Sequence, residues 1–154
     1  MKRANIVCCA LSCRRNSEER MTKQVIFDNE FATLWYYPEA GIVHHQIKKF
    51  LTAPPLKAML SKGTEVLKAK HATKWLSDDR NNGALPPEII PWIKNEWEPQ
   101  TVHAGWKFWA QVLPVSVIAQ MNAKRFQESA GQAGVVKKQF ADPVEALRWL
   151  ESQK

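Results

Sequence analysis

The sequence has no cysteine after residue 13, since its three cysteines are Cys8, Cys9 and Cys13. The rest of the chain therefore forms no intramolecular disulfide, as is typical of proteins from a reducing compartment. The spacing of these cysteines also lacks the second pair of ligands that a structural zinc site needs. We expect a cytoplasmic protein with no cysteine-bound metal.

The sequence also lacks any stretch near the ~20 consecutive apolar residues that a membrane-spanning helix needs. It has no glycine-rich phosphate-binding loop and no RNA-binding sheet motif, although its formal net charge is +7. Five lysines fall on or just after one expected helix, where such a run is typical of a solvated face: Lys57, Lys62, Lys68, Lys70 and Lys74. We expect neither a membrane span nor a nucleic-acid partner.

The first twenty residues differ in character from the rest. Lys2-Arg3 precedes a short apolar run, Ile6–Leu11, which two arginines follow closely. This run is at the short end for a signal peptide. Two interpretations stay open: a vestigial signal, or an extension ahead of a biological start at Met21, which we favour. We therefore expect an N-terminal extension, residues 1–20, and one domain, residues 21–154, with room for a sizeable core.

The first half of the domain predicts an antiparallel hairpin followed by a helix. Aromatic and β-branched residues predict strands over 24–28, 31–37 and 41–47. The turn residues of Pro38–Gly41 join the last two strands. Apolar residues then recur every three or four positions over 52–70, as in a helix with one buried face. Gly63 lies on that apolar stripe and indicates a close approach of helix to sheet.

The second half predicts strands that alternate with helices. The expected elements are a strand over 73–77, broken helical turns over 89–97, a strand over 106–113, a helix over 116–130, a strand over 135–140 and a helix that begins at Asp142. Prolines at 86, 87, 91 and 99 argue against one continuous helix between the first two strands of this half. The order predicts an α/β fold with a mixed β-sheet, an antiparallel N-terminal hairpin and helices packed on the sheet.

A polar segment after the expected strand at Trp75 is the strongest candidate for function. Its residues are Ser77, Asp78, Asp79, Arg80, Asn81 and Asn82. In open α/β sheets, ligands and partners lie beyond the carboxyl ends of strands, so we expect this loop to bind a partner or ligand. The alternative is structural: the two aspartates cap a helix and Arg80 pairs with one of them.

The histidines do not predict a metal site. His44 and His45 are neighbours on an expected strand, so their side chains point to opposite faces of the sheet. His71 and His103 lie on other elements. We interpret all four as structural or surface residues, and we expect no metal and no other cofactor.

Four segments carry a resemblance to a known family: Leu34–Pro38, Trp75–Asn81, Gly105–Ala110 and Asp142–Ala146. Together with the element order, over residues 22–152, the chain resembles the STAS superfamily in its SpoIIAA-like branch of small bacterial proteins. This resemblance implies a regulatory or protein-interaction domain rather than an enzyme.

The resemblance also implies a way in which such a domain is switched. In the anti-sigma-factor antagonists, a phosphorylated Ser at the start of the helix after the corresponding strand controls partner binding. Here Asp78-Asp79 stand where the antagonists carry an Asp-Ser pair. A permanent carboxylate imitates the modified state, or the switch is absent, so Ser77 is not assigned as a phosphorylation site.

Other relatives of this kind resemble the CRAL-TRIO lipid carriers, which implies a lipophilic ligand between sheet and helices. Trp92, Trp97, Phe108 and Trp109 would line such an apolar groove. Ordinary core packing, which we favour, explains the same four residues without a ligand.

Three hypotheses for function remain. The first, which we favour, is a non-enzymatic module that presents the 78–82 loop to a protein partner or to a second copy of the chain; it predicts a solvent-exposed loop. The second is a carrier or sensor of a small lipophilic molecule, which predicts an enclosed cavity beneath residues 86–104. The third, which we least favour, is an enzyme in which Asp78 and Asp79 bind Mg²⁺.

Overall fold

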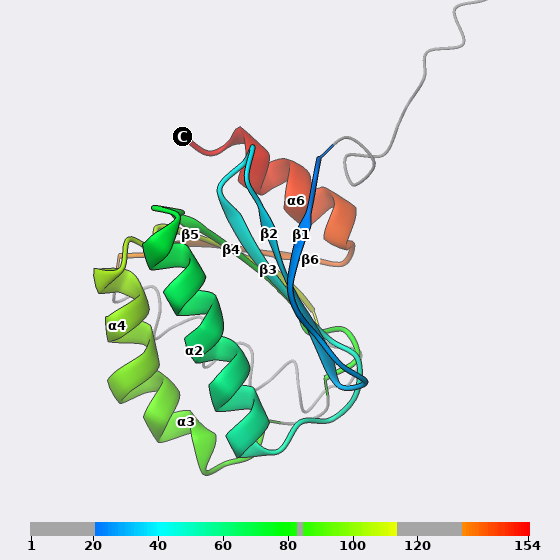
Figure 1. Cartoon of the computed structure of the whole chain (residues 1–154), viewed down its shortest axis with the longest axis vertical. Coiled ribbons are helices and arrows are strands. Elements are labelled where there is room, and N and C mark those ends of the chain that lie inside the picture. Colours follow the sequence, from blue (N-terminus) through cyan, green and yellow to red (C-terminus); the bar gives the residue numbers. More distant parts are fainter. Residues whose placement is uncertain (1–20, 83–84, 114–133) are drawn as a thin grey trace, which may run out of the picture.

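The structure is a computed structural model that describes residues 21–82, 85–113 and 134–154. One six-stranded sheet lies at its centre (Figure 1), and its strands follow chain order from β1 to β6. Neighbouring strands from β1 to β3 pair antiparallel, and those from β3 to β6 pair parallel. The strands are β1 Gln24–Asp28, β2 Ala32–Tyr37, β3 Ile42–Ile47, β4 Lys74–Asp78, β5 Phe108–Val112 and β6 Val136–Phe140. The predicted α/β class, mixed sheet and N-terminal hairpin are confirmed.

Helices cover both faces of this sheet. Helix α2 (Ala53–Ala69) and the helical run after β4 lie on one face, and α6 (Pro143–Ser152) lies on the other (Figure 1). We call these the α2 face and the α6 face. The predicted helix over 116–130 and the expected extension over 1–20 lie outside the described residues. Among the helices that are described, none is long and apolar enough to cross a membrane.

The hairpin of β2 and β3 forms where the turn residues predict it. Gly41 has a φ of +64°, and its N–H donates to the carbonyl of Tyr37 over 2.9 Å. A left-handed backbone of this kind favours glycine. The register then pairs Trp35 with His44 and Leu34 with His45. Because side chains alternate along a strand, His44 lies on the α6 face and His45 on the α2 face.

The helical run after β4 is continuous, so the prediction of broken turns is wrong. It consists of α3 (Ile89–Trp92), a π-helical turn η1 (Ile93–Trp97) and α4 (Glu98–His103). Pro91 and Pro99 each lie in the first turn of an α-helical piece, where a backbone N–H needs no intrahelical partner. The π-helical turn between them shifts the hydrogen-bond register, and the chain thereby accommodates both prolines.

The core of the α2 face is built on tryptophan. Trp75 is fully buried, and its ring centroid lies 5.3 Å from that of Trp97. Trp106 lies 5.5 Å from Trp97 and 5.4 Å from Trp109, so the four rings form one cluster. Gly63 of α2 lies against this cluster, and a Cβ there would overlap the ring of Trp75. The predicted close approach of helix to sheet is confirmed.

The core of the α6 face is smaller and begins at a capped helix end. Asp142 is the N-cap of α6, and its Oδ1 accepts a 2.7 Å hydrogen bond from the N–H of Val144. Pro143 follows in the first turn, as the sequence predicts. Ala146, Leu147 and Leu150 of α6 pack on apolar residues of the sheet: Tyr37, Ile42, Leu76, Ala110 and Val112.

Candidate functional site

The polar segment after Trp75 turns largely inward. Strand β4 extends to Asp78, so the side chains of this segment alternate between the two faces of the sheet. Ser77 is 4% exposed and Asp78 is 2% exposed, and the expectation of a solvent-exposed loop is wrong for these two residues. Asp79, Arg80 and Asn82 are half-buried, and Asn81 is exposed.

On the α2 face, this segment completes a buried polar network. The indole N–H of Trp75 donates to Nδ1 of His45 over 3.0 Å, and Nε2 of His45 lies 3.2 Å from Oδ1 of Asp79. Gln111 donates through Nε2 to Oδ2 of Asp79 over 3.2 Å, although its own carbonyl oxygen has no partner within the described residues. Ser77 accepts the indole N–H of Trp109 over 2.9 Å.

The hydrogen bond from Trp75 determines which ring nitrogen of His45 is the acceptor. An indole N–H only donates, so Nδ1 of His45 is an unprotonated acceptor. The proton of the neutral ring is therefore on Nε2, where it donates to Asp79. This histidine–carboxylate pair is absent from the sequence interpretation because the two residues are 34 positions apart. With both ring nitrogens bonded inside the protein, His45 is a structural residue.

On the α6 face, Asp78 forms a closed pair with Arg80. The guanidinium donates from Nε to Oδ1 and from Nη2 to Oδ2, each over 2.8 Å, and Gln46 donates to Oδ2 over 3.3 Å. Burial acts to raise the pKa of Asp78, but the hydrogen bonds and charge of Arg80 outweigh it and hold this pKa below its ordinary value. Asp78 is therefore a buried carboxylate whose oxygens are already occupied.

The two aspartates do not converge on one site. Asp78 bonds to Gln46 and Arg80 on the α6 face, whereas Asp79 bonds to His45 and Gln111 on the α2 face. A shared Mg²⁺ would need both carboxylates on the same side. Across the described residues, no group of three or more His, Cys, Asp or Glu side chains is placed to hold a metal ion.

The four aromatic residues expected around an apolar groove do not share one. Trp97 and Trp109 are buried in the core of the α2 face, where Trp97 donates its indole N–H to the carbonyl of Leu60 over 3.1 Å. Phe108 lies on the opposite face, against Trp149 of α6, because consecutive strand residues alternate. Trp92 is half-buried and lies under the ammonium of Lys57. The prediction that these four residues line one apolar groove is therefore wrong.

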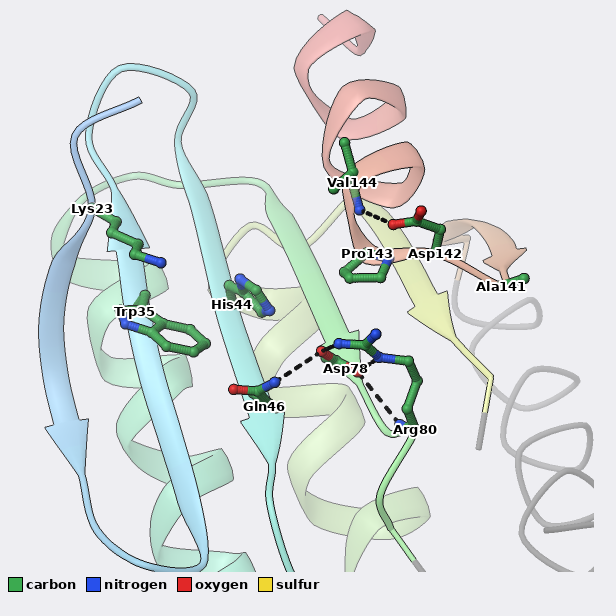
Figure 2. Close-up of a pocket in the computed structure, with 10 residues that line it drawn as sticks. All are labelled: Lys23, Trp35, His44, Gln46, Asp78, Arg80, Ala141, Asp142, Pro143 and Val144. Atoms are coloured by element: carbon green, nitrogen blue, oxygen red, sulfur yellow. Dashed lines mark hydrogen bonds and ion pairs between the residues drawn. The ribbon is translucent and has the colours of Figure 1, made fainter. Parts of the chain in front are cut away.

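A pocket of about 580 Å³ lies on the α6 face beside Asp78. Figure 2 shows Lys23, Trp35 and His44 on one side of this pocket and the first turn of α6 on the other. The Arg80 side chain folds back toward Asp78 between them. We call this space the α6-face pocket; its lining is Lys23, Trp35, His44, Gln46, Asp78, Arg80 and residues 141–144.

His44 is the unusual member of this lining. It is only 5% exposed, and its Nδ1 lies 3.1 Å from the hydroxyl of Tyr37. Its Nε2 is buried and has no hydrogen-bond partner in the part of the chain that the structure describes. Burial lowers the pKa of His44 to about 3. The negative charge of Asp78 acts to raise this pKa, and the positive charges of Lys23 and Arg80 act to lower it. The ring is therefore neutral at physiological pH.

The sequence interpretation places Asp78 and Arg80 at the site and misses most of the other lining residues. Lys23, His44 and Asp142 are far apart in the chain, and the pairing of the strands from β1 to β6, with α6 after β6, brings them to one face. One local signal was present: the alternation of His44 and His45 shows that one of them lies on each face. Strand alternation from Trp75 would likewise have turned Asp78 inward.

Comparisons of the chain with protein-family models, with curated proteins and with solved structures found no match. The geometry of the α6-face pocket therefore carries the functional conclusion by itself.

Proposed function

We propose that this protein is a non-enzymatic binding domain that takes up a small polar molecule in the α6-face pocket. One observation carries the proposal: the buried Nε2 of His44 has no hydrogen-bond partner among the described residues, and His44 belongs to the lining of a pocket of about 580 Å³. A volume of this size is within the range of small-molecule sites.

The energetics of His44 support this proposal. A buried polar group without a hydrogen bond destabilises a protein by about 1–3 kcal/mol, and buried polar groups are nearly always satisfied in folded proteins. A ligand atom that bonds to Nε2 removes this penalty. The closed pair of Asp78 and Arg80 stands beside His44 as a rigid, pre-formed wall, which lowers the entropy lost on binding.

A role as a binding domain is compatible with the regulatory function implied by the STAS resemblance, which stays a prediction. The position of the polar segment changes the expected binding site. Because Ser77 and Asp78 point inward, the ligand approaches the α6 face rather than the tip of the loop. The buried hydroxyl of Ser77, bonded to Trp109, also disfavours a phosphorylation switch at that residue.

The proposal is tested by screening polar fragments against the full-length protein by amide NMR. We expect several fragments to shift resonances of the pocket lining, and Ala141→Trp to abolish these shifts because the new side chain fills the pocket. Ala58→Trp, at an exposed position of α2, is the matched control and should bind like the wild type. Fragments that leave the lining unperturbed, or that bind Ala141→Trp equally well, would refute the pocket as the site.

A second candidate function is association with a protein partner, for which we propose a second copy of this chain. Phe31 and Phe50 are 38% and 54% exposed, and the carbonyl of Phe31 accepts hydrogen bonds from the N–H groups of Lys48 and Lys49. The two phenylalanines thus belong to neighbouring segments. Sedimentation equilibrium should show a dimer that the double variant Phe31→Ser, Phe50→Ser dissociates; a monomeric wild type would refute this candidate.

A further inference from the structure

The protonation of His44 decides what kind of atom the α6-face pocket accepts. Nδ1 of His44 is 3.1 Å from the hydroxyl of Tyr37. A phenol is a stronger acid than a neutral imidazole, and an imidazole nitrogen is a better acceptor than a phenol oxygen, so this hydrogen bond is stronger with Tyr37 as the donor and Nδ1 as the acceptor. This assignment puts the proton on Nε2. With this assignment, His44 presents an N–H donor that has no acceptor among residues 21–82, 85–113 and 134–154.

Lys23 adds a positive charge on the same side of the pocket. Its ammonium lies 4.9 Å from the centroid of the Trp35 ring, and Trp35 pairs with His44 across β2 and β3. Lys23 forms no ion pair with any residue that the structure describes. An exposed cation next to a buried N–H donor is suited to an oxygen that carries negative charge.

The other charges of the pocket do not oppose an anion on the side of Lys23 and His44. The charge of Arg80 is compensated by Asp78, to which it is bound by two hydrogen bonds. The carboxylate of Asp142 lies on the opposite wall, where it caps α6 (Figure 2). An anion is therefore favoured beside Lys23 and His44 and disfavoured near Asp142.

Part of the remaining lining is apolar. The Trp35 ring, Pro143 and Val144 face the space between the sheet and the first turn of α6 (Figure 2). Small-molecule sites commonly combine apolar walls with a few polar groups that fix the orientation of the ligand. The pocket thus offers contact to an apolar body as well as to a charged group.

We propose that the ligand of the α6-face pocket is a small organic anion whose carboxylate or phosphate oxygens accept the His44 Nε2–H and pair with Lys23. This proposal rests on the proposed function and specifies the ligand class for the same site. The apolar body of the anion lies against Trp35 and the start of α6.

The test compares three probes of similar shape by chemical-shift titration of the full-length protein. Benzoate and phenyl phosphate carry the two anionic groups, and benzamide is the neutral counterpart of benzoate. We expect one or both anions to bind at the pocket lining at least tenfold more tightly than benzamide, and their ranking distinguishes a carboxylate from a phosphate ligand.

Two lysine variants give a matched comparison for the charge. Lys23→Met should weaken anion binding at least fivefold and leave benzamide unchanged. Lys57→Met is the control, because Lys57 also stands over a tryptophan, at 5.1 Å from the Trp92 ring on another part of the molecule. Its affinity for the anions should equal that of the wild type.

The outcomes separate the two proposals. Benzamide binding at the lining as tightly as benzoate would overturn the anionic class and leave the pocket as a binding site. Equal anion affinity in Lys23→Met and the wild type would overturn the pairing with Lys23. If neither the anionic probes nor benzamide perturb the pocket lining, and the fragments bind elsewhere, both proposals would be overturned.

Discussion

His44 and His45 are consecutive, equally buried and on opposite faces of the sheet, yet their surroundings differ. His45 is 4% exposed, and both of its ring nitrogens are bonded, one to Trp75 and one to Asp79. His44 is 5% exposed and bonds to Tyr37 through Nδ1, while its Nε2 has no partner among the residues that the structure describes. The chemical difference is one missing hydrogen bond.

This difference separates a structural role from a binding role. A buried polar group with all its hydrogen bonds made is part of the packing of the protein. A buried group with one bond missing, in the lining of a pocket, is available to a ligand. Burial and residue type alone therefore do not identify the functional histidine, whereas the count of bonds at each nitrogen does.

The largest predicted effect comes from breaking the α2-face network. His45→Leu leaves the indole of Trp75 and the carboxylate of Asp79 without their partner, and it should lower the free energy of unfolding by about 4 kcal/mol. His44→Leu removes a nitrogen that is already unsatisfied and one bond to Tyr37, so its loss should be about 1 kcal/mol. Urea unfolding at pH 7 measures both values, and equal losses would contradict the distinction between the two histidines.

A smaller loss of stability is expected from a substitution that crowds the Trp75 ring, whose indole N–H bonds to His45. Gly63→Ala puts a Cβ into the Trp75 ring. The resulting strain of up to about 3 kcal/mol outweighs a helix-propensity gain of about 1 kcal/mol. We expect a net loss of about 2 kcal/mol in thermal or urea unfolding. Ser61→Ala, at an exposed position of the same helix, is the control and should change stability by less than about 0.5 kcal/mol.

The smallest predicted effect is a pH dependence from His44. Its pKa is lowered from 6.5 to about 3 in the folded protein, so below pH 6.5 the unfolded chain binds a proton that the folded protein does not. Stability due to this group is therefore lost as the pH falls. The titratable and charged groups around His44 are Asp78, His45, Lys23 and Arg80.

The loss from His44 should be about 1 kcal/mol between pH 6.5 and pH 5.5, and it should disappear in His44→Leu. Urea unfolding of both proteins at several pH values in this window measures the difference. The same slope in wild type and variant would show that His44 is not held neutral by burial.

Local sequence patterns were sufficient for most of the fold. The turn residues of Pro38–Gly41 and the N-cap and proline at Asp142-Pro143 act within a few positions, so their structural effect can be predicted without knowing the tertiary structure. Gly63 could be predicted as a packing contact because it interrupts an apolar stripe. The π-helical turn over 93–97 could not be predicted, because a single π turn produces no distinct spacing of apolar residues in the sequence.

The candidate site was harder to predict because its members are brought together by strand pairing. Asp78 and Asp79 follow an apolar strand as a polar run, which is typical of a loop, but their partners lie about 32–34 residues away along the chain. Those distant partners are Gln46, His45 and Gln111, whereas Arg80 is only two residues from Asp78 and pairs with it as the structural alternative predicts. Without the strand order, no local pattern shows that the distant partners pair with the two aspartates inside the protein.

A ¹⁵N NMR spectrum that resolves the side chains of His44 and His45 during titration with benzoate shows directly whether the α6-face pocket binds an anion through His44. We predict that His44 is a neutral Nε2–H tautomer at pH 7 and that Nδ1 of His45 is the acceptor of the Trp75 indole N–H. We also predict that benzoate shifts Nε2 of His44 in a saturable manner while His45 stays unchanged. A His44 ring that does not respond, or a His45 ring that responds equally, would contradict the account.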